Sequence, residues 1–506
     1  MKKGLRVEIV CFHRIKLSPF LKDIVLTTIT SIFIIVSMIF VTRILAKELG
    51  PDEFGIYSLA RRMVSLVIPF STLSMGVTLT RYIAVSDDGD KRSDYLVSTM
   101  LIVLCASLLL VGVAFLGGRN LTILIFHSPQ YLNLFYCCLF MSVGFGSFTI
   151  LYAYYRGIQM MNLANLWQIC IIAILPLAIS YAFAQYRNIS LIIFLMGLST
   201  YLSIFPLIII VKKWKRKEFK QLRLDIRGLL NYGIPRTPGG VAFAGLLAIG
   251  PFLAPYFGSM RDAGYLVIGQ SVFRIIEASV VAFGLVALPK ISQIFSEGKI
   301  DFLKSRISDI LTMIIHLGVF IVIQLFIWSN EIVSIWLGNE YLKSVPIIKI
   351  FLVSLCPYLG YVMLRSIIDA VEERAINTLN LFISFGITTV SSLAFGYMGF
   401  GVLGLALGIT IGLLSLGVLS THFLVKRYKL TFKNMELMWI LFTNCLFAGV
   451  TIITKKYLVS HFDSIMLLIA VLLIGSLLFI FYMWLLYKKD IEWVMQLKIR
   501  VFSVTI

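Results

Sequence analysis

The chain has 506 residues, of which 59% are hydrophobic and 14% are charged, and its formal net charge is +20 at pH 7. So much apolar surface cannot all be buried in the core of a soluble protein of this length. The bilayer must therefore act as the solvent, which excludes a sizeable soluble domain and predicts an all-α polytopic membrane protein, with basic residues that mark topology rather than nucleic-acid binding.

Apolar runs follow one another along the whole chain. Taking about 20 residues per span as the criterion, we expect fourteen transmembrane helices. They lie near residues 24–46, 56–82, 96–117, 131–155, 163–184, 190–211, 229–257, 264–288, 309–328, 347–368, 377–396, 401–425, 437–454 and 464–487. The first run is too long for a signal-peptide core and lacks a small-residue cleavage pattern, so we expect it to be retained.

Lysine and arginine alternate strongly between the two sides of these spans. The side of both termini collects 31 of them and the other side 7. Because cytoplasmic segments carry the excess, we expect both termini to be cytoplasmic, in a cell (inner or plasma) membrane. The basic segment 212–228 contributes most and separates the sixth span from the seventh.

An internal repeat appears when the sequence is shifted by 208 residues. The shift pairs Leu45 with Leu253, Ala46 with Ala254, Gly50 with Gly258, Tyr57 with Tyr265, and Gly76 with Gly284. Six spans per half is an even number, so the halves are expected to be parallel repeats about an axis along the membrane normal. We predict a six-helix lobe over 1–211, a basic cytoplasmic linker over 212–228, a second six-helix lobe over 229–430, and two further helices with a cytoplasmic tail over 431–506.

Two of the turns resemble a known family. The stretch RILAKELGPDEFGIYSLARRMVSL (Arg43–Leu66) resembles the first outer turn of Wzx-type polysaccharide flippases, in the multidrug/oligosaccharidyl-lipid/polysaccharide exporter (MOP) superfamily. GYMGFGVLGLALG (Gly396–Gly408) resembles their turn between spans 11 and 12. The resemblance implies two lobes around a central cavity that opens to alternate sides and is lined mainly by helices 1, 2, 7 and 8.

The same resemblance implies a function. Its substrate is expected to be an oligosaccharide linked to a polyprenyl pyrophosphate carrier, moved from the cytoplasmic to the outer leaflet for cell-surface polysaccharide biosynthesis. Membrane lipids and glycan polymerases or glycosyltransferases are the expected partners. No enzyme activity, cofactor or metal is expected.

Basic residues inside the spans identify a candidate site. A charge at membrane depth costs roughly 2.5 to 3.5 kcal/mol, so each requires a reason. Seven lie within or at the edges of spans: Arg43, Arg61, Arg62, Arg236, Arg274, Lys349 and Arg365. The first five fall on spans 1, 2, 7 and 8, and we predict that they form a cationic ladder that binds the pyrophosphate, because guanidinium groups pair well with phosphate oxygens. Lys349 and Arg365 are expected to be interfacial anchors.

Polar stripes support a cavity-facing site. Ser58, Arg62, Ser65, Pro69 and Thr72 share one helical face, as do Gln270, Arg274 and Glu277. The alternatives are snorkelling for Arg43, Arg61, Arg62 and Arg236, and an ion pair between Arg274 and Glu277, three residues apart. Glu277 could otherwise couple transport to a cation. A kinked or interrupted seventh span is predicted by Pro235, Pro238, Gly239, Gly240, Pro251 and Pro255.

Two other functions are compatible with parts of the sequence. An ion-coupled multidrug exporter of the same superfamily would favour acidic residues in the cavity, whereas Glu277 is the one carboxylate well inside a predicted span. A membrane glycosyltransferase or ligase would need an acid/base constellation on a large outer loop. The five histidines are scattered, and the seven cysteines lie mostly within apolar runs, where we expect core residues.

Overall fold

The computed structural model describes residues 19–86, 88–212, 219–277, 300–371, 376–428, 434–461 and 464–488. These residues are almost entirely helical and contain no strand, which confirms the all-α prediction. Within them, eight helices are long and apolar enough to cross a membrane, or nine if the bent pair Asn339–Leu352 and Leu355–Arg365 counts as one span. The chain is therefore a multi-pass membrane protein.

The helices keep the order predicted along the chain. Those of the first half are α1 (Pro19–Thr72), α2 (Met75–Val85), α3 (Gly89–Phe126), α4 (Leu132–Gly157), α5 (Met161–Gln168), α6 (Leu175–Phe183), α7 (Ile189–Thr200) and α8 (Ile204–Val211). Those of the second half are α9 (Phe219–Gly233), α10 (Thr237–Phe257), a helix over 260–277, α12 (Ile300–Trp336), α13 (Val345–Leu352), α14 (Leu355–Val371), α15 (Ile376–Phe395), α16 (Gly401–Tyr428), α17 (Asn434–His461) and α18 (Ser464–Lys488). Short 3-10 or π turns are η1 (Pro129–Tyr131), η2 (Ile169–Ile174), η3 (Ala184–Tyr186), η4 (Tyr201–Ser203), η5 (Ile234–Arg236), η6 (Asn339–Ser344) and η7 (Gly396–Phe400).

Glycines fold the longest helical stretches back on themselves. The 54 residues of α1 would extend far beyond a hydrocarbon core of about 30 Å at about 1.5 Å per residue. Gly50, with a φ of 73°, breaks the helix into two limbs, and Gly399 and Gly401 have positive φ at the turn between α15 and α16. Only glycine adopts such angles at little cost. Each of the fourteen predicted spans overlaps a helix, and the eighth is described as far as residue 277.

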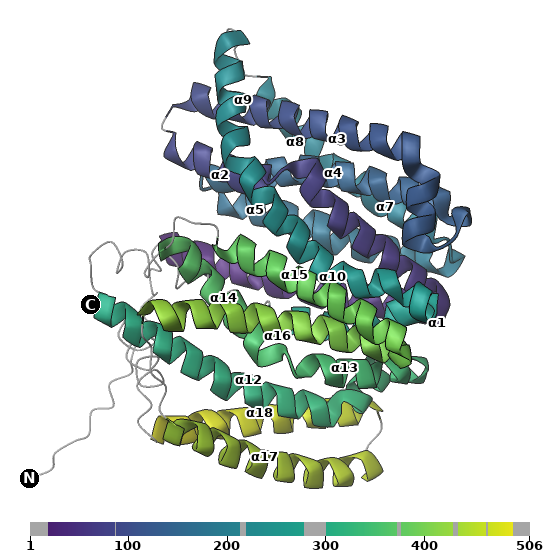
Figure 1. Cartoon of the computed structure of the whole chain (residues 1–506), viewed down its shortest axis with the longest axis vertical. Coiled ribbons are helices and arrows are strands. Elements are labelled where there is room, and N and C mark those ends of the chain that lie inside the picture. Colours follow the sequence, from purple (N-terminus) through teal and green to yellow (C-terminus); the bar gives the residue numbers. More distant parts are fainter. Residues whose placement is uncertain are drawn as a thin grey trace, which may run out of the picture.

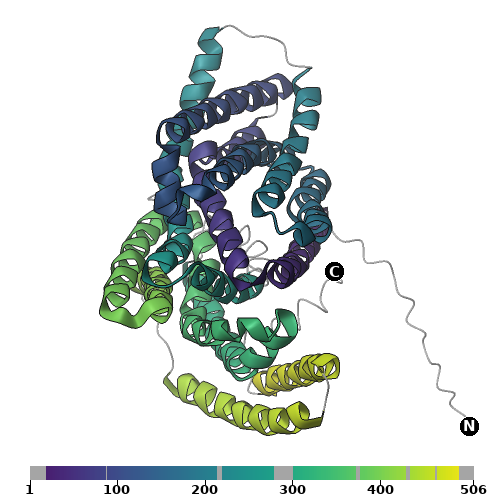
Figure 2. The same cartoon turned by 90° about the vertical axis from the view of Figure 1, so that its right-hand side faces the viewer.

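The two halves of the chain lie side by side. Figures 1 and 2 show the blue helices of the first half above the green helices of the second half, with α1 in purple reaching down between them and α17 and α18 in yellow at the far edge. One large hydrophobic core joins the halves. It includes Leu45 and Leu59 of α1, Leu246 of α10, Ile347 of α13 and Leu405 of α16.

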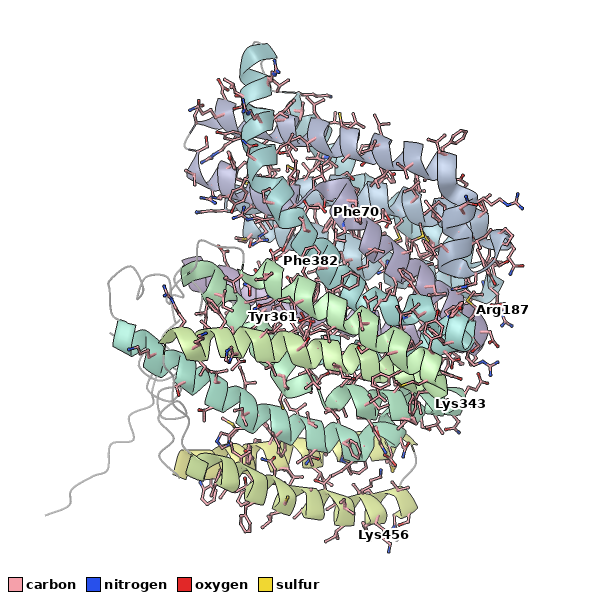
Figure 3. The ribbon with its side chains drawn as sticks, viewed as in Figure 1. Phe70, Arg187, Lys343, Tyr361, Phe382 and Lys456 are labelled. Atoms are coloured by element: carbon pink, nitrogen blue, oxygen red, sulfur yellow. The ribbon has the colours of Figure 1, made fainter. Side chains whose placement is uncertain are left out.

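The loops alternate between two ends of the molecule. Arg187, Lys343 and Lys456 come from loops predicted to lie on one side of the membrane, and Figure 3 shows all three at the same end. The end of α2 and the start of α3 lie at the opposite end (Figure 1). The arrangement agrees with the predicted alternation, while the assignment of one end to the cytoplasm stays a prediction.

Polar contacts fix α17 and α18 against α12. The hydroxyl of Tyr482 lies 2.9 Å from Nδ1 of His316 and 3.3 Å from Nδ2 of Asn444. Further along α12, the Gln324 amide donates a hydrogen bond to the Thr451 hydroxyl of α17 at 3.0 Å, and Glu331 forms an ion pair with Lys455 of α17 at 2.8 Å.

The seventh span, the linker and two cysteines can each be compared with their sequence predictions. The seventh span is interrupted as predicted, at η5, which contains Pro235; α10 continues through Pro251 and Pro255. The predicted linker, 212–228, already contains the start of α9, and the lobe boundaries stay a prediction. Cys105 and Cys445 have exposed side chains, so placing these two in the core was wrong.

Candidate functional site

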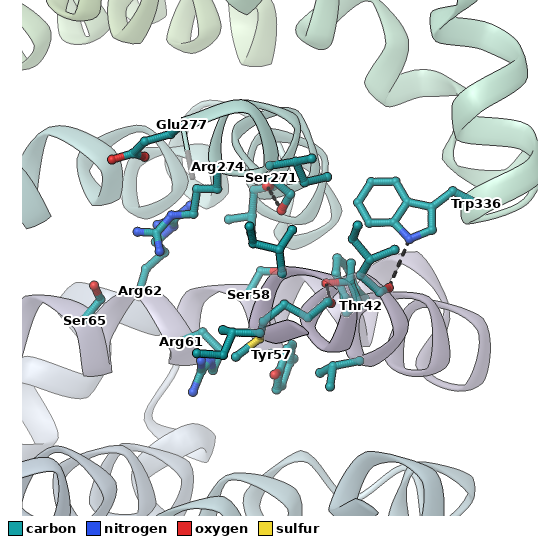
Figure 4. Close-up of a pocket in the computed structure, with 18 of the residues that line it drawn as sticks. Thr42, Tyr57, Ser58, Arg61, Arg62, Ser65, Ser271, Arg274, Glu277 and Trp336 are labelled. Atoms are coloured by element: carbon teal, nitrogen blue, oxygen red, sulfur yellow. Dashed lines mark hydrogen bonds between the residues drawn. The ribbon is translucent and has the colours of Figure 1, made fainter. Parts of the chain in front are cut away.

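A cavity of about 450 Å³ lies between α1 and the helix over 260–277, with Trp336 of α12 at its edge (Figure 4). The fold at Gly50 brings both limbs of α1 to this cavity, because the chain reverses direction there. The polar side chains that line it are Ser31, Thr42, Tyr57, Ser58, Arg61, Arg62, Ser65, Ser271, Arg274 and Glu277. Residues from both halves of the chain therefore form one polar site.

The two predicted polar stripes face this region. Ser58, Arg62 and Ser65 line the cavity from the second limb of α1. Gln270, Arg274 and Glu277 line an adjoining space that also borders Tyr358. Helical periodicity correctly placed these six side chains, whereas Pro69 and Thr72, predicted on the same face as Arg62, line neither space.

Arg62 is the most enclosed cation of the site, with 8% of its surface exposed. Its guanidinium donates a hydrogen bond to Oε1 of Gln270. The Gln270 amide donates in turn to the carbonyl of Leu247 at 3.0 Å, which directs its oxygen toward Arg62. The buried charge is thus held by a neutral amide, and Arg62 Nε has no hydrogen-bond partner among the described residues.

Arg274 extends into the cavity toward Arg62 (Figure 4). It is exposed to the cavity and makes no hydrogen bond or ion pair with any residue that the structure describes. The Glu277 carboxylate lies apart from the Arg274 guanidinium in Figure 4, and Glu277 borders the adjoining space together with the buried Tyr358. Arg274 and Glu277, both of which the structure describes, therefore do not form the ion pair that was the alternative prediction.

Arg61 projects from the other side of α1 (Figure 4). Its Nη1 lies 3.9 Å from the sulfur of Met141, a weak contact that leaves the charge unpaired within the part of the chain described. Three arginines and one glutamate therefore surround one space. An anion entering it would be attracted, because positive charge in low-dielectric surroundings acts strongly.

Two predicted cavity cations lie elsewhere. Arg43 is exposed and does not line the cavity. Arg236 lies with its guanidinium carbon 3.6 Å from the ring centroid of Tyr232 and donates to the Tyr232 carbonyl at 2.9 Å. The structure therefore gathers Arg61, Arg62 and Arg274 instead of building the predicted five-membered ladder.

Trp336 and Tyr358 were missed from the sequence. Trp336 donates from Nε1 to the carbonyl of Ile39 at 3.1 Å and closes one edge of the cavity. It lies beyond the predicted end of its span, because α12 continues to residue 336. Tyr358 sits in an apolar run whose residues give no sign of which face meets Glu277.

Contacts between the halves close the cavity toward the Gly50 turn. Arg261 Nε donates to Asp52 Oδ1 at 3.1 Å, and the Tyr341 hydroxyl donates to the carbonyl of Ala46 at 2.7 Å. A Cβ on Gly55 would overlap the carbonyl oxygen of Met260, so the backbones meet there directly. We call these three contacts, Asp52–Arg261, Ala46–Tyr341 and Gly55–Met260, the clasp.

Nothing in the described residues resembles a metal centre. No group of three or more histidine, cysteine, aspartate or glutamate side chains comes together within them. The charged groups that line the described part of the cavity are three guanidinium groups and one carboxylate, and guanidinium groups are suited to pairing with anions.

The fold and the cavity together define a multi-pass helical membrane protein with a polar cavity between its two halves. The family model described as "Polysaccharide biosynthesis protein" matches residues 20–295, and the chain belongs to this family. No curated protein sequence matches the chain.

Solved structures show which fold the chain adopts. The lipid II flippase MurJ in an inward closed conformation superposes with a TM-score of 0.72 at 17% identity, covering 92% of this chain and 99% of MurJ. A multidrug resistance MATE transporter of the MOP superfamily, inward-facing, gives 0.66 at 12% identity, covering 79% and 98%. An outward-facing MATE structure gives 0.56 at 13%, covering 82% and 97%. The family match agrees with the predicted resemblance to polysaccharide biosynthesis proteins, and the solved structures show that the chain shares the fold of MurJ and of MATE transporters.

Proposed function

We propose that this chain is a flippase that moves a polyprenyl-pyrophosphate-linked oligosaccharide from the cytoplasmic to the outer leaflet of the cell membrane by alternating access. The observation that carries the proposal is the buried Arg62, whose guanidinium is hydrogen-bonded to the neutral amide of Gln270 and is not paired with a carboxylate among the described residues. An uncompensated buried cation is costly and is retained where it serves a ligand. A pyrophosphate supplies the missing negative charge.

Arg62 and Arg274 have separate roles in this mechanism. The direction of the Arg62 guanidinium is fixed by Gln270, and its buried Nε has no partner within the described chain. Arg274 is accessible from the cavity and is able to follow the ligand. The hydroxyls of Ser58 and Ser65 lie on the same wall and suit the bridging oxygens or the first sugar.

The sign of the charge distinguishes this proposal from a drug exporter. The cavity carries Arg61, Arg62 and Arg274 against Glu277 alone, so a cationic drug would be repelled. The MurJ likeness supports a lipid-linked substrate, since that protein is titled a lipid II flippase. The MATE likeness concerns the fold, and membership of a polysaccharide biosynthesis family favours a saccharide over a drug.

The test uses the purified full chain in proteoliposomes that contain a short polyprenyl-pyrophosphate-linked oligosaccharide. A membrane-impermeant glycosidase in the medium reports the fraction of glycan exposed. Arg62→Gln and Arg274→Gln are expected to slow translocation about tenfold or more, because each removes a charge-assisted contact with phosphate.

The control is Arg119→Gln, which removes an exposed charge outside the cavity and is expected to transport at the normal rate. A fluorescent organic cation in the same vesicles is expected not to be exported. Export of that cation with no translocation of the glycan would replace the proposal with the drug-exporter function.

A further inference from the structure

A second cavity, of about 420 Å³, lies at the end of the molecule where α2 ends and α3 begins. It shares no lining residue with the central cavity. The described residues that line it are Arg81, Tyr82, Val85, Ser86, Lys91, Tyr95 and Tyr232. Nothing in the function proposed above uses this cavity.

The helix α9 forms one wall of this cavity. It lies across α2 and α3 on the left of Figure 1. Leu229 is fully buried, whereas Arg223 and Arg227 are exposed, so the helix is amphipathic. The Tyr82 hydroxyl donates to the carbonyl of Gly228 at 3.0 Å and holds α9 against α2. An amphipathic basic helix at the end of a membrane bundle lies at the level of the lipid headgroups.

Three tyrosine rings make up the apolar part of the cavity. The rings of Tyr82 and Tyr95 are 5.2 Å apart and meet edge to face. Those of Tyr82 and Tyr232 are 6.2 Å apart in a similar geometry. Such rigid rings offer flat faces and hydroxyls to a glycerol or sugar unit.

Cations border the tyrosine wall. The guanidinium of Arg81 lies 4.5 Å from the ring centroid of Tyr232, next to Arg236 on the same ring. Stacking uses the face of a guanidinium and leaves its N–H edge able to donate. Arg81 makes no hydrogen bond or ion pair among the described residues, and Lys91 is exposed on the facing wall.

Two described aspartates near the cavity, Asp88 and Asp94, do not line it. Asp88 caps α3 by accepting from the backbone of Asp90 at 2.9 Å. Asp94 is buried. The described lining therefore carries two positive charges and no carboxylate, which selects for an anion.

We propose that this cavity binds the phosphate-bearing headgroup of an anionic membrane lipid. The phosphate lies between Arg81 and Lys91, and the glycerol or sugar unit rests on the tyrosine wall. Basic pockets at the ends of membrane helices suit such headgroups, because they combine charge attraction with position at the interface. The site is distinct from the central cavity and holds lipid at the membrane surface.

The test places an environment-sensitive fluorophore on the pocket wall, at Val85→Cys, in the full chain after replacement of the native cysteines. Val85 is 79% exposed, so labelling leaves the fold intact. Phosphatidylglycerol, polyprenyl diphosphate and zwitterionic phosphatidylcholine are titrated separately in detergent micelles. We expect a saturable change with either or both anionic lipids and none with phosphatidylcholine.

Charge removal inside and outside the pocket then tests the position of the site. Arg81→Gln with Lys91→Gln is expected to weaken the response about tenfold or more. The matched control, Arg223→Gln with Arg227→Gln, removes two exposed charges from the same end of the molecule and is expected to bind normally. Arg81→Lys, which keeps the charge and loses the guanidinium, is expected to bind with intermediate strength and serves where the double variant fails to fold.

The lipid arms identify the source of the phosphate. A response to polyprenyl diphosphate alone makes the pocket a site for a lipid carrier, and a response to both makes it a general anionic-headgroup site; either supports the proposal. No saturable response to either lipid, or an equal loss in the pocket and control pairs, would overturn it.

Discussion

Arg62 donates a hydrogen bond to Gln270, and 208 residues separate the two. The same offset pairs Tyr57 with Tyr265 in the sequence, so the predicted repeat puts Arg62 and Gln270 at equivalent positions of the two halves. In parallel repeats, equivalent helices meet along the axis between the halves, and contact between Arg62 and Gln270 is what such a repeat predicts. A cation on one helix and an amide on the other leave this meeting point positively charged.

The first prediction changes that balance without removing Arg62. Gln270→Glu keeps an oxygen in place to accept from Arg62 and adds a negative charge to the site. We expect glycan translocation in proteoliposomes to fall about tenfold, because the compensated arginine attracts pyrophosphate less. Gln185→Glu, the same change at an exposed position, is expected to have no effect. Normal transport by Gln270→Glu would show that the uncompensated charge is not required.

The second prediction concerns the clasp. Gly55→Ala places a methyl group where the carbonyl oxygen of Met260 lies, and overpacking of this kind costs about 1 to 3 kcal/mol. We expect the variant to shift toward a state with the clasp open. Fluorescence energy transfer between labels at Lys47→Cys and Lys343→Cys, exposed positions of the two halves, measures the separation.

The control for this experiment is Gly386→Ala, because a Cβ there meets nothing within 4 Å. This variant is expected to give the same energy transfer as the labelled protein that carries no glycine substitution. An unchanged distance in Gly55→Ala would mean that the clasp accommodates the added methyl group without opening.

Much of the fold follows from hydropathy alone. In hydrocarbon every backbone group must bond within its own helix, so long apolar runs have one solution. The turn at Gly50 was also readable, because GPDE combines a glycine with a proline and two acids that end an apolar run. The position of Trp336 could not be predicted in this way, because α12 continues past the apolar run that marked its span.

The predicted five-membered ladder differs from the structure for a physical reason. A ladder of cations on spans 1, 2, 7 and 8 requires straight helices that all face one axis. The 3-10 turn η5 ends at Arg236, and the guanidinium folds back onto the ring of Tyr232 instead of reaching inward. Stacking on an aromatic ring four residues earlier competes with a cavity position, and spacing alone cannot decide between them.

The third prediction tests the orientation. In a chain without native cysteines, a membrane-impermeant thiol reagent applied to intact cells is expected to label Asn120→Cys and not Arg223→Cys. Both positions are exposed in the structure and lie on loops predicted to face opposite sides. Labelling at Arg223→Cys would reverse the proposed direction of transport.

The fourth prediction concerns the attachment of α17 and α18. Tyr482→Phe removes the hydroxyl that meets both His316 and Asn444. We expect the free energy of unfolding to fall by about 0.5 to 1.5 kcal/mol, seen as a lower thermal midpoint in detergent. Tyr181→Phe, at a position that is 81% exposed, is the matched control. Equal midpoints for the two variants would show that the network adds nothing to docking.

The last prediction concerns how the membrane potential resets the empty carrier. The cavity contains three arginines and one glutamate, so without ligand it is positively charged. Moving one charge across the membrane is worth about 2.3 kcal/mol per 100 mV. If the clasp lies on the outer side, an inside-negative potential favours the state in which the clasp is closed, because that state exposes the positive cavity toward the cytoplasm.

We therefore expect energy transfer between labels at Lys47→Cys and Lys343→Cys to rise when an inside-negative potential is imposed on uniformly oriented proteoliposomes. Arg62→Gln combined with Arg274→Gln removes two of the cavity charges and is expected to flatten this response, whereas Arg119→Gln, outside the cavity, is expected to keep it. A label separation that is the same at every potential in the unaltered cavity would refute the charge-driven reset, and the flippase proposal would then depend on the translocation assay alone.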